Sequence, residues 1–448
     1  MFGKRKLWPL GATAALAVVA VLAAACGSSS SSSTPTPTTA AGSSPAASAT
    51  TGSASPAASS SASSLDAAKA KLATITGDTT GVTNTEVKIG SYYALTGPAS
   101  VYADIEKAWL AYFDNVNKNG GIAGRQIKFT VYDDGYNPTN TKNVVNKLIN
   151  QDKVFMLFNG LGTPTGNAVL PDVLAAGIPS YFLATGDAKW ADQGPSIIGL
   201  QPDYVTEGTV LGKYAATNYA GKKAAVIYQN DDFGKEGLQG VKAGLGSALQ
   251  VVDTETYEAN AADWNAQALK AINAGAQVLL VYSTPTQYAA ALKYVKQQGK
   301  SVVWISSSVA ASSSTAKLAA GGMDGTFTTA YIKDPTDPDP NIQKAVQFFK
   351  DHGIANPNAF SLYGYMAAQH LERLLTVVGK NLNRASLEYA LQNVAFQGDW
   401  QSSLLLQPTI ITQTDHKPIE YMWIQRWDEA KGVFTKVSDI FNEETTKK

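Results

Sequence analysis

Two short apolar runs on either side of a helix-like segment constrain the fold of this chain most strongly. Residues Val154 to Phe158 and Ile178 to Leu183 each have the length and composition of a buried strand. Pro164 suits the first turn of a helix between them, so the segment predicts two parallel strands joined by a helical crossover. Their loops then lie at one edge of a sheet, where ligands bind in open α/β proteins.

The loops at this edge contain residues suited to an anion. They supply three glycines and three threonine hydroxyls: Gly160, Gly162, Gly166, Thr163, Thr165 and Thr185. Glycines let backbone N–H groups approach a ligand closely, and a helix N-terminus favours negative charge. We therefore predict that the edge holds the carboxylate of a small molecule, although an ordinary strand-to-helix turn has the same local pattern.

Strand-like and helix-like segments alternate along the rest of the chain. One series begins at Glu86, and a second begins near Tyr204 with strands such as Ala224 to Tyr228 and Gln277 to Tyr282. This alternation predicts parallel βαβ units of the α/β class. Two such doubly wound, Rossmann-like lobes with facing loop edges form an interlobe cleft.

Composition excludes several classes of function. The 448 residues suffice for more than one domain, and 36 basic against 36 acidic residues leave no positive field for nucleic acid. Cys26 is the only cysteine and the three histidines are scattered, which argues against a disulfide, a cysteine-based metal site or a histidine-pair site. Asp337 and Asp339 favour a solvated Pro-rich turn over a calcium loop.

The amino terminus has the pattern of a targeting segment. Lys4, Arg5 and Lys6 precede an apolar run that ends in Leu-Ala-Ala-Ala-Cys, which resembles a bacterial lipobox. The resemblance implies a signal peptide over residues 1–25 and a diacylglycerol group on Cys26; an uncleaved membrane anchor is the alternative. Residues 26–84 then form a tether rich in Ser, Thr, Pro and Ala that is expected to be disordered, with a short helix possible over Leu65 to Thr76.

Motifs of catalysis are missing from the sequence. It has no G-x-S-x-G elbow, no P-loop and no H-E-x-x-H motif, and Gly160 to Gly166 misses the dinucleotide spacing by one residue. We therefore predict a binding protein rather than an enzyme, with no cofactor and no metal.

Several motifs together resemble one known family. The segments KIGSYYALTGPAS, NKNGGIAGRQIKFTVYDDGYNP, IYQNDDFGKEGL and AYIKDPTDP are similar to those of the branched-chain amino-acid-type substrate-binding proteins of ABC importers. The resemblance implies two type I periplasmic-binding-protein lobes that close around a ligand by a hinge. It places crossovers near Gln201, Tyr331 and Gln397. The implied lobes are residues 85–200 with 330–396, and 201–329 with 397–448.

The same resemblance implies a set of ligand-binding residues. Those of the first lobe that would meet a ligand carboxylate are Leu161, Gly162, Thr163, Ala184 and Thr185. Tyr102 takes the place of a cleft tyrosine, and Phe233 and Thr284 those of closing residues of the second lobe. Ser308 stands where amino-acid-binding members have a glutamate, so the ligand is expected to lack an amine, because a buried ammonium without a partner costs several kcal/mol. Aromatic residues available to flank an apolar or aromatic acid are Tyr92, Tyr93, Trp190, Phe233 and Tyr331, although core packing is the favoured role for any one of them taken alone.

The resemblance implies an extracytoplasmic, lipid-anchored receptor that feeds an ABC importer. Its partners would be a permease and ATPase subunits, with no nucleic acid, and the receptor itself is expected to be a monomer. Two alternatives stay open: a ligand-sensing receptor on the same fold that signals to a membrane partner, and an extracellular hydrolase.

Overall fold

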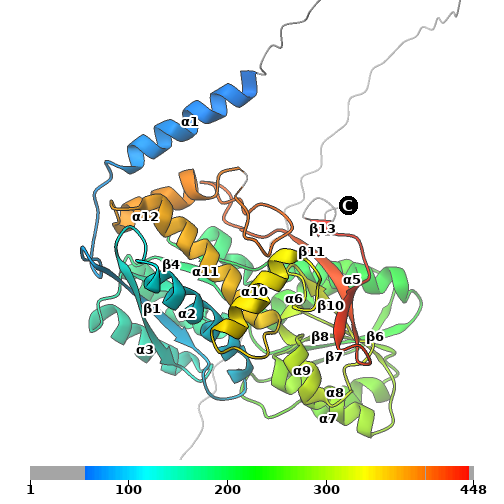
Figure 1. Cartoon of the computed structure of the whole chain (residues 1–448). Helices are drawn as coiled ribbons and strands as arrows, with labels where there is room; N and C mark the ends of the chain where they lie inside the picture. Colours follow the sequence, from blue (N-terminus) through cyan, green and yellow to red (C-terminus); the bar gives the residue numbers. More distant parts are fainter. Residues whose placement is uncertain (1–55, 399, 443–448) are drawn as a thin grey trace, which may run out of the picture. The chain divides into compact units, whose positions relative to one another are not determined.

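The structure, a computed structural model, describes residues 56–398 and 400–442. Cys26 and the predicted signal peptide lie outside the described residues. The described part forms two α/β lobes, each built on its own sheet (Figure 1). No helix in this part is apolar over a length that would cross a bilayer.

The first lobe contains a five-stranded parallel sheet in the order β2-β1-β3-β4-β5. These strands are β1 (Glu86–Tyr93), β2 (Gln126–Asp133), β3 (Met156–Phe158), β4 (Ser180–Leu183) and β5 (Ile197–Gly199). One face of the sheet packs against α2 (Ala103–Lys118) and α11 (Ala359–Val378), and the other against α3 (Pro138–Asn150) and α4 (Thr163–Ala175). Also in this lobe are α10 (Pro340–Asp351) and α12 (Arg384–Ala390).

The second lobe contains an eight-stranded sheet in the order β12-β11-β10-β9-β8-β6-β7, with β13 paired to β11. Its strands are β6 (Lys223–Gln229), β7 (Gln250–Tyr257), β8 (Val278–Tyr282), β9 (Val303–Ser306), β10 (Phe327–Ala330), β11 (Tyr421–Asp428), β12 (Val433–Lys436) and β13 (Phe441–Asn442). Its helices are α5 (Tyr204–Asn218), α6 (Asp232–Leu245), α7 (Asn265–Asn273), α8 (Pro285–Gln297) and α9 (Ser313–Ala319). The strands from β7 to β10 run parallel, while β11 and β12 are antiparallel.

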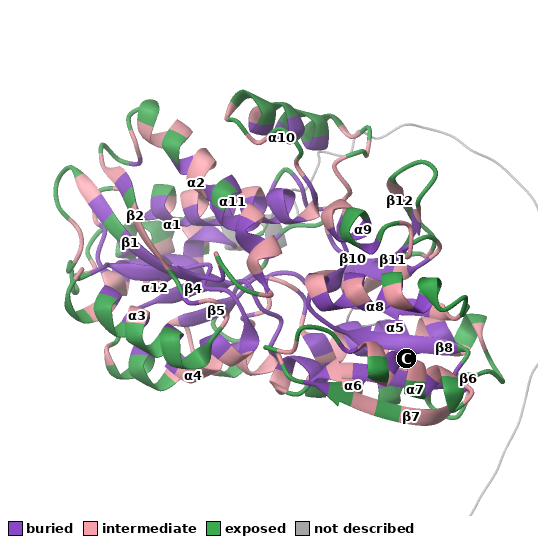
Figure 2. Ribbon diagram, turned by 90° about the horizontal axis from the view of Figure 1, so that it is seen from below, coloured by how far each residue is buried: buried purple, intermediate pink, exposed green. Residues whose placement is uncertain are grey.

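Burial on both faces explains why the central strands are continuously apolar. In β8, Leu279 and Val281 pack on the side of α7 and α8, whereas Val278 and Leu280 pack on the side of α5 and α6. Figure 2 shows these strands as buried ribbons between layers of amphipathic helices. Parallel sheets covered on both faces require this composition, and the predicted fold class of two doubly wound lobes is confirmed.

The carboxy-terminal crossover differs from the sequence-based boundary at Gln397. Leu404, Leu405, Ile411 and Ile419 are buried in the core of the first lobe, and the chain enters the second sheet only with β11. The segment has apolar residues without a strand or helix period, so its sequence did not indicate which lobe it covers.

Part of the predicted tether is helical. Residues Pro56–Leu72 form α1, which overlaps the helix expected over Leu65 to Thr76 and begins earlier, and Leu72 is buried against the first lobe. Asn381 donates hydrogen bonds to the carbonyls of Leu72 and Ile75, both at 2.9 Å. Arg384 forms an ion pair of 2.8 Å with Asp78.

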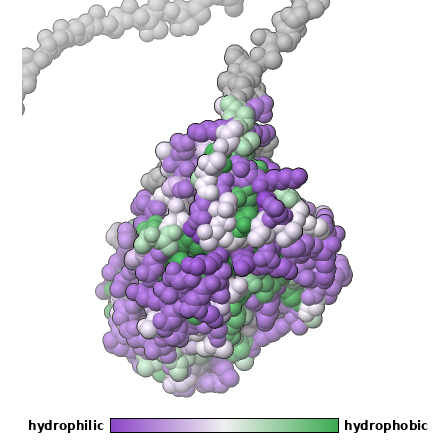
Figure 3. Space-filling model, turned by 90° about the vertical axis from the view of Figure 1, so that its left-hand side faces the viewer, coloured by the Kyte–Doolittle hydropathy of each residue, from purple (hydrophilic) through white to green (hydrophobic). Residues whose placement is uncertain are grey.

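The face of the first lobe seen in Figure 3 is mainly hydrophilic.

Candidate ligand-binding site

A cavity of about 90 Å³ lies between the lobes beside the crossovers after β5 and β10. None of the described residues that line it is charged. All of the predicted site residues except Thr185 line it: Tyr102, Leu161, Gly162, Thr163, Ala184, Phe233, Thr284, Ser308 and Tyr331. A charged ligand group in this cavity must therefore be met by hydrogen bonds and peptide dipoles.

The loops after β3 and β4 meet as predicted, but their main-chain donors are already used. Leu161 and Ala184 form an isolated parallel bridge. The Leu161 N–H donates to the Tyr92 carbonyl (3.3 Å), the Gly162 N–H to the Ala184 carbonyl (3.2 Å), and the Ala184 N–H to the Gly160 carbonyl (3.0 Å). These three amides build the loop edge, so a ligand carboxylate needs other donors.

The N-terminus of α4 supplies such donors. Amides in the first turn of a helix have no carbonyl one turn earlier to bond to, and no side chain among the described residues caps α4. Thr163 begins the helix, and its hydroxyl lies 2.6 Å from that of Thr185. Thr185 is thus a buried partner of Thr163 behind the cavity wall. The Thr163 hydroxyl and the first-turn amides of α4 form the anion-binding end of the cavity.

Tyr204 and Gln201 belong to the same end and were missed from the sequence. Both line the cavity, and the Gln201 amide donates to the Tyr204 hydroxyl (3.1 Å). Burial raises the pKa of Tyr204, and hydrogen bonding with Gly186, Thr185 and Thr163 lowers it in part. Tyr204 begins α5, one residue after its cap, so its position depends on the crossover rather than on a local motif.

Tyr136 is another residue that the sequence analysis missed. It lines the cavity with a left-handed backbone (φ +59°), and its N–H donates to the Asp134 carboxylate (2.8 Å). Its ring packs on Gly162, where a Cβ would lie 2.4 Å from the Tyr136 Cε2. The Asp-Asp-Gly-Tyr-Asn turn was the available signal, because such turns hold strained residues at loop edges.

The expected aromatic neighbours are divided between cavity and core. Phe233 and Tyr331 line the cavity, together with Phe360 and Tyr363 of α11. Tyr92, Tyr93 and Trp190 instead lie in the cores on the two faces of the first sheet. These three residues thus have the core-packing role that was the favoured alternative for each of them.

The second lobe contains a buried carboxyl group beside Ser308 that is not apparent from the sequence. Glu207 of α5 is 3% exposed, and its Oε1 accepts hydrogen bonds from the Ser308 N–H (2.8 Å) and the Thr329 hydroxyl. Burial raises the pKa of Glu207, and the hydrogen bonds from Thr329 and Ser308 lower it in part. The region around Ser308 is therefore not free of acid, although the acid is a hundred residues away in sequence.

Direct hydrogen bonds join the lobes across the cleft. The Tyr102 hydroxyl donates to the Val309 carbonyl (2.8 Å), and the Thr286 hydroxyl donates to the Pro98 carbonyl (2.7 Å). The two lobes are therefore in direct contact, and one of these contacts, between Tyr102 and Val309, lies in the cavity wall.

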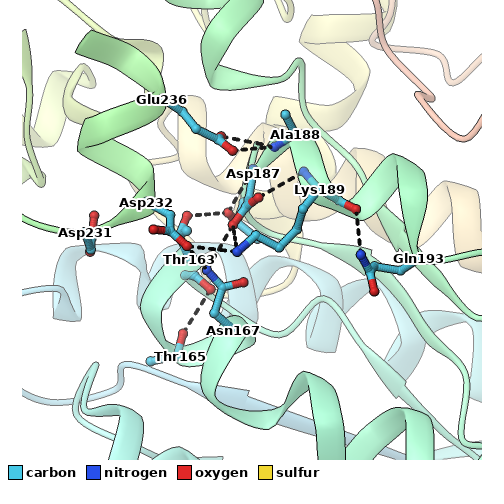
Figure 4. Close-up of polar contacts among 12 residues, drawn as sticks. Thr163, Thr165, Asn167, Asp187, Ala188, Lys189, Gln193, Asp231, Asp232 and Glu236 are labelled. Carbon is cyan, nitrogen blue, oxygen red and sulfur yellow. Dashed lines mark hydrogen bonds and ion pairs between the residues drawn. The ribbon is translucent and has the colours of Figure 1, made fainter. Parts of the chain in front are cut away.

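A second group of contacts, the interlobe polar cluster, joins α4 and the Asp187–Lys189 loop to the start of α6 (Figure 4). Its residues are Asn167, Asp187, Ala188 and Lys189 of the first lobe and Asp232 and Glu236 of the second. Lys189 forms an ion pair with Asp232 (2.8 Å), and the Ala188 N–H donates to both Glu236 carboxylate oxygens (3.3 and 3.1 Å).

The interlobe polar cluster contains more acid than base. Asp187 has a fully buried side chain, 3.4 Å from the Lys189 ammonium. Burial and the neighbouring charge of Asp187 raise the pKa of Glu236 to about 8. Lys189 stays positive, because its bonds to Asp232 and Asp187 outweigh burial and raise its pKa. A proton on Glu236 thus relieves the repulsion between carboxyl groups from opposite lobes.

Comparison with known proteins agrees with this architecture. A curated Leu/Ile/Val-binding protein homolog 1 from Brucella suis is 27% identical over 308 residues, which cover 66% of this chain and 80% of that protein. A fatty acid ABC transporter substrate-binding protein from Thermomonospora curvata is similar in structure, with a TM-score of 0.73, 20% identity, and coverage of 83% and 96%. A branched-chain amino acid ABC transporter protein from Thermus thermophilus with bound valine has a TM-score of 0.73, 19% identity, and coverage of 82% and 99%.

The family model described as periplasmic binding protein matches residues 86–432, which include the first sheet, strands β6 to β11 of the second sheet and the cavity between the lobes. The chain therefore belongs to the periplasmic binding protein family.

Proposed function

We propose that the protein is the extracytoplasmic solute-binding receptor of an ABC importer and that it captures a small carboxylate-bearing ligand. The observation that carries the proposal is the anion-binding end of an otherwise uncharged cavity that is lined in part by aromatic rings. Thr163 begins α4 there, with Thr185 bonded to its hydroxyl and Tyr204 beside it. A helix N-terminus with hydroxyl donors binds a carboxylate without a basic side chain.

Capture proceeds by closure of the two lobes. Ligand binding in the cleft bridges Thr163 of the first lobe and Phe233 of the second, and closure forms contacts such as that between Tyr102 and Val309. A ligand shifts this equilibrium only through its greater affinity for the closed form. The closed receptor then docks on a permease whose ATPase subunits supply the energy, while lipidation of Cys26 holds the receptor at the membrane.

Replacing Thr163 by valine is expected to weaken carboxylate binding about ten- to hundredfold, since a hydrogen bond to a charged group contributes about 1.5–3 kcal/mol. Valine keeps the shape of the side chain but removes the hydroxyl. The measurement is titration calorimetry with a carboxylate found by thermal-shift screening of the purified full chain. A ligand at about a hundredfold its dissociation constant adds about 2.7 kcal/mol of stability.

Thr139→Val in α3 serves as a matched control, because Thr139 is an exposed threonine in the first turn of another helix of the same lobe. Unchanged affinity in Thr163→Val would remove the α4 N-terminus from the site. No stabilisation by any carboxylate in the screen would contradict the proposed function itself.

A further inference from the structure

Strand β4 is irregular at Phe182, next to the anion-binding end of the cavity. Between Tyr181 and Leu183 its pairing with β5 shifts by one residue, so Phe182 is the extra residue of a β-bulge. Phe182 has a left-handed backbone (φ +58°), although it is a bulky residue and fully buried. A residue with a Cβ adopts this conformation at a cost that the surrounding structure has to offset.

The bulge changes the direction in which the following side chains point. Tyr181 and Phe182 both pack in the core on the α2 and α11 side of the sheet, whereas a regular strand points successive residues to opposite faces. Leu183 then packs on the α3 and α4 side. Because a shift of one residue exchanges the faces of all later side chains, a regular β4 would turn Thr185 away from Thr163.

Asn159, the residue after β3, stabilises the bulge. Its side-chain amide donates to the Phe182 carbonyl (2.6 Å), and its backbone N–H donates to the Tyr181 carbonyl (3.0 Å). Its side-chain oxygen accepts a hydrogen bond from the hydroxyl of Tyr93 in β1 (2.9 Å). Asn159 is itself fully buried and left-handed (φ +52°), a conformation that asparagine tolerates better than most residues. These hydrogen bonds join the ends of the neighbouring strands β1, β3 and β4 behind the loop edge.

We infer that Asn159 shapes the anion-binding end of the cavity by holding the bulge at Phe182, which places Thr185 against the Thr163 hydroxyl. Asn159 is not one of the described residues that line the cavity, so it is a positioning residue. The inference rests on the proposed function, because it concerns the threonine pair at the start of α4, where the ligand carboxylate is proposed to bind. It also gives the strained backbone of Phe182 a role at the site, since bulges beside binding sites redirect side chains.

The test measures the contact between positions 163 and 185 without a ligand. Thr163→Cys and Thr185→Cys are introduced together into the full chain, with Cys26→Ser so that no other cysteine is present. The two hydroxyl oxygens are 2.6 Å apart, so two sulfur atoms at these places are within reach of each other. Copper(II) phenanthroline accepts two electrons while the two thiols release two protons and join as a disulfide. Mass spectrometry of samples taken over time gives the rate.

Asn159→Gly is expected to slow disulfide formation at least about fivefold, because the buried Phe182 carbonyl loses its donor. Glycine removes the amide but adopts the left-handed backbone of this position without strain. Asn117→Ala is the matched control and should leave the rate unchanged. Asn117 also joins two elements of the first lobe through both side-chain atoms, at 2.8 and 2.7 Å from the backbone of Ile127, but in the edge strand β2.

The rates are compared at a temperature at which thermal unfolding shows every variant to be folded. A purely structural Asn159 would lower the melting temperature and leave the rate unchanged, and that result would overturn the inference. If Asn159→Gly does not fold, Asn159→Asp replaces it with the same expected result, because an ionised aspartate keeps the shape and the acceptor for Tyr93 but has no hydrogen for the Phe182 carbonyl.

The cross-linking also separates this inference from the proposed function. If no disulfide forms while Asn159 is unchanged, the contact between positions 163 and 185 is absent and the inference is wrong. A slower rate in Asn159→Gly supports the inference even if no carboxylate stabilises the chain, and that second result overturns the proposed function alone.

Discussion

Raising the pH from about 5.5 to about 8.5 is expected to weaken ligand binding by up to about tenfold per pH unit until about pH 8. Burial and Asp187 raise the pKa of Glu236 from the usual 4.5 to about 8 in the closed form. In an open form, separated from Asp187, Glu236 regains the pKa of an ordinary carboxyl group. Closure therefore takes up a proton between these two values.

This proton uptake determines the direction in which ligand binding changes with pH. The contribution to closure is fully present below the ordinary pKa of Glu236 and is lost as the pH rises through about 8, where ionised Glu236 and Asp187 repel each other. Asp203 adds further negative charge near Glu236, while the Lys189 ammonium lies 3.4 Å from the Asp187 carboxylate. A small surface pocket next to the interlobe polar cluster is lined by Asp187 together with His416 and Lys417. Partial exposure of Glu236 screens these interactions, so tenfold per unit is the upper limit.

Calorimetry across this pH range with one carboxylate ligand measures the slope, that is, how steeply the logarithm of the dissociation constant changes with pH. Glu236→Gln imitates the protonated side chain and is expected to flatten it. Glu258→Gln, an exposed change in the same lobe, should retain the wild-type slope. A slope that is equally steep in Glu236→Gln would show that the interlobe polar cluster does not link closure to pH.

Replacing Gly162 by alanine is expected to reduce ligand affinity by more than about a hundredfold and to destabilise the fold by about 1–3 kcal/mol. Gly162 caps α4 with φ +100° and ψ +150°, a conformation that essentially only glycine adopts. An added Cβ would lie 2.4 Å from the Tyr136 ring and 2.7 Å from the Thr165 hydroxyl. Relief of these contacts moves Tyr136 or the first turn of α4, and both belong to the cavity wall.

Gly177→Ala provides the matched control at the other end of α4. Gly177 also has a positive φ (+57°), but nothing lies within 4 Å of an added Cβ. Its cost is expected to be about 1–2 kcal/mol of stability with unchanged affinity. Thermal unfolding and calorimetry of both variants separate the effect of backbone strain from that of the contact between the added Cβ and the Tyr136 ring. Full affinity in Gly162→Ala would contradict the assignment of Tyr136 and α4 to the site.

Local patterns predicted the strands and the loop edge because each signal is contained in a short segment. The apolar runs that became β3 and β4 and the proline in the first turn of α4 require no knowledge of distant residues. The meeting of Leu161 with Ala184 followed from parallel strand order alone. Which amides stay free was not predictable, because that depends on the register of the bridge itself.

The polar end of the second lobe depends on contacts between residues far apart in sequence. Glu207 meets Ser308 and Thr329 across separations of 101 and 122 residues. In sequence, Glu207 is an ordinary acidic residue in the first turn of a helix, where the helix dipole favours one. Only the packing of α5 against β9 and β10 shows that its carboxyl group faces a cavity wall. The packing of Leu404, Leu405, Ile411 and Ile419 into the core of the first lobe likewise depends on contacts with residues distant in sequence.

The attachment of α1 has a mechanical consequence. Leu72 and the segment after it are bonded to Asn381 and Arg384, which belong to the first lobe. In the proposed hinge motion, whatever restrains the amino-terminal side of the chain restrains the first lobe alone. The first lobe then stays fixed relative to the tether, and the second lobe rotates about the hinge. The end of the ligand bound at α4 therefore keeps a constant position relative to the tether, while the second lobe covers and releases the other end.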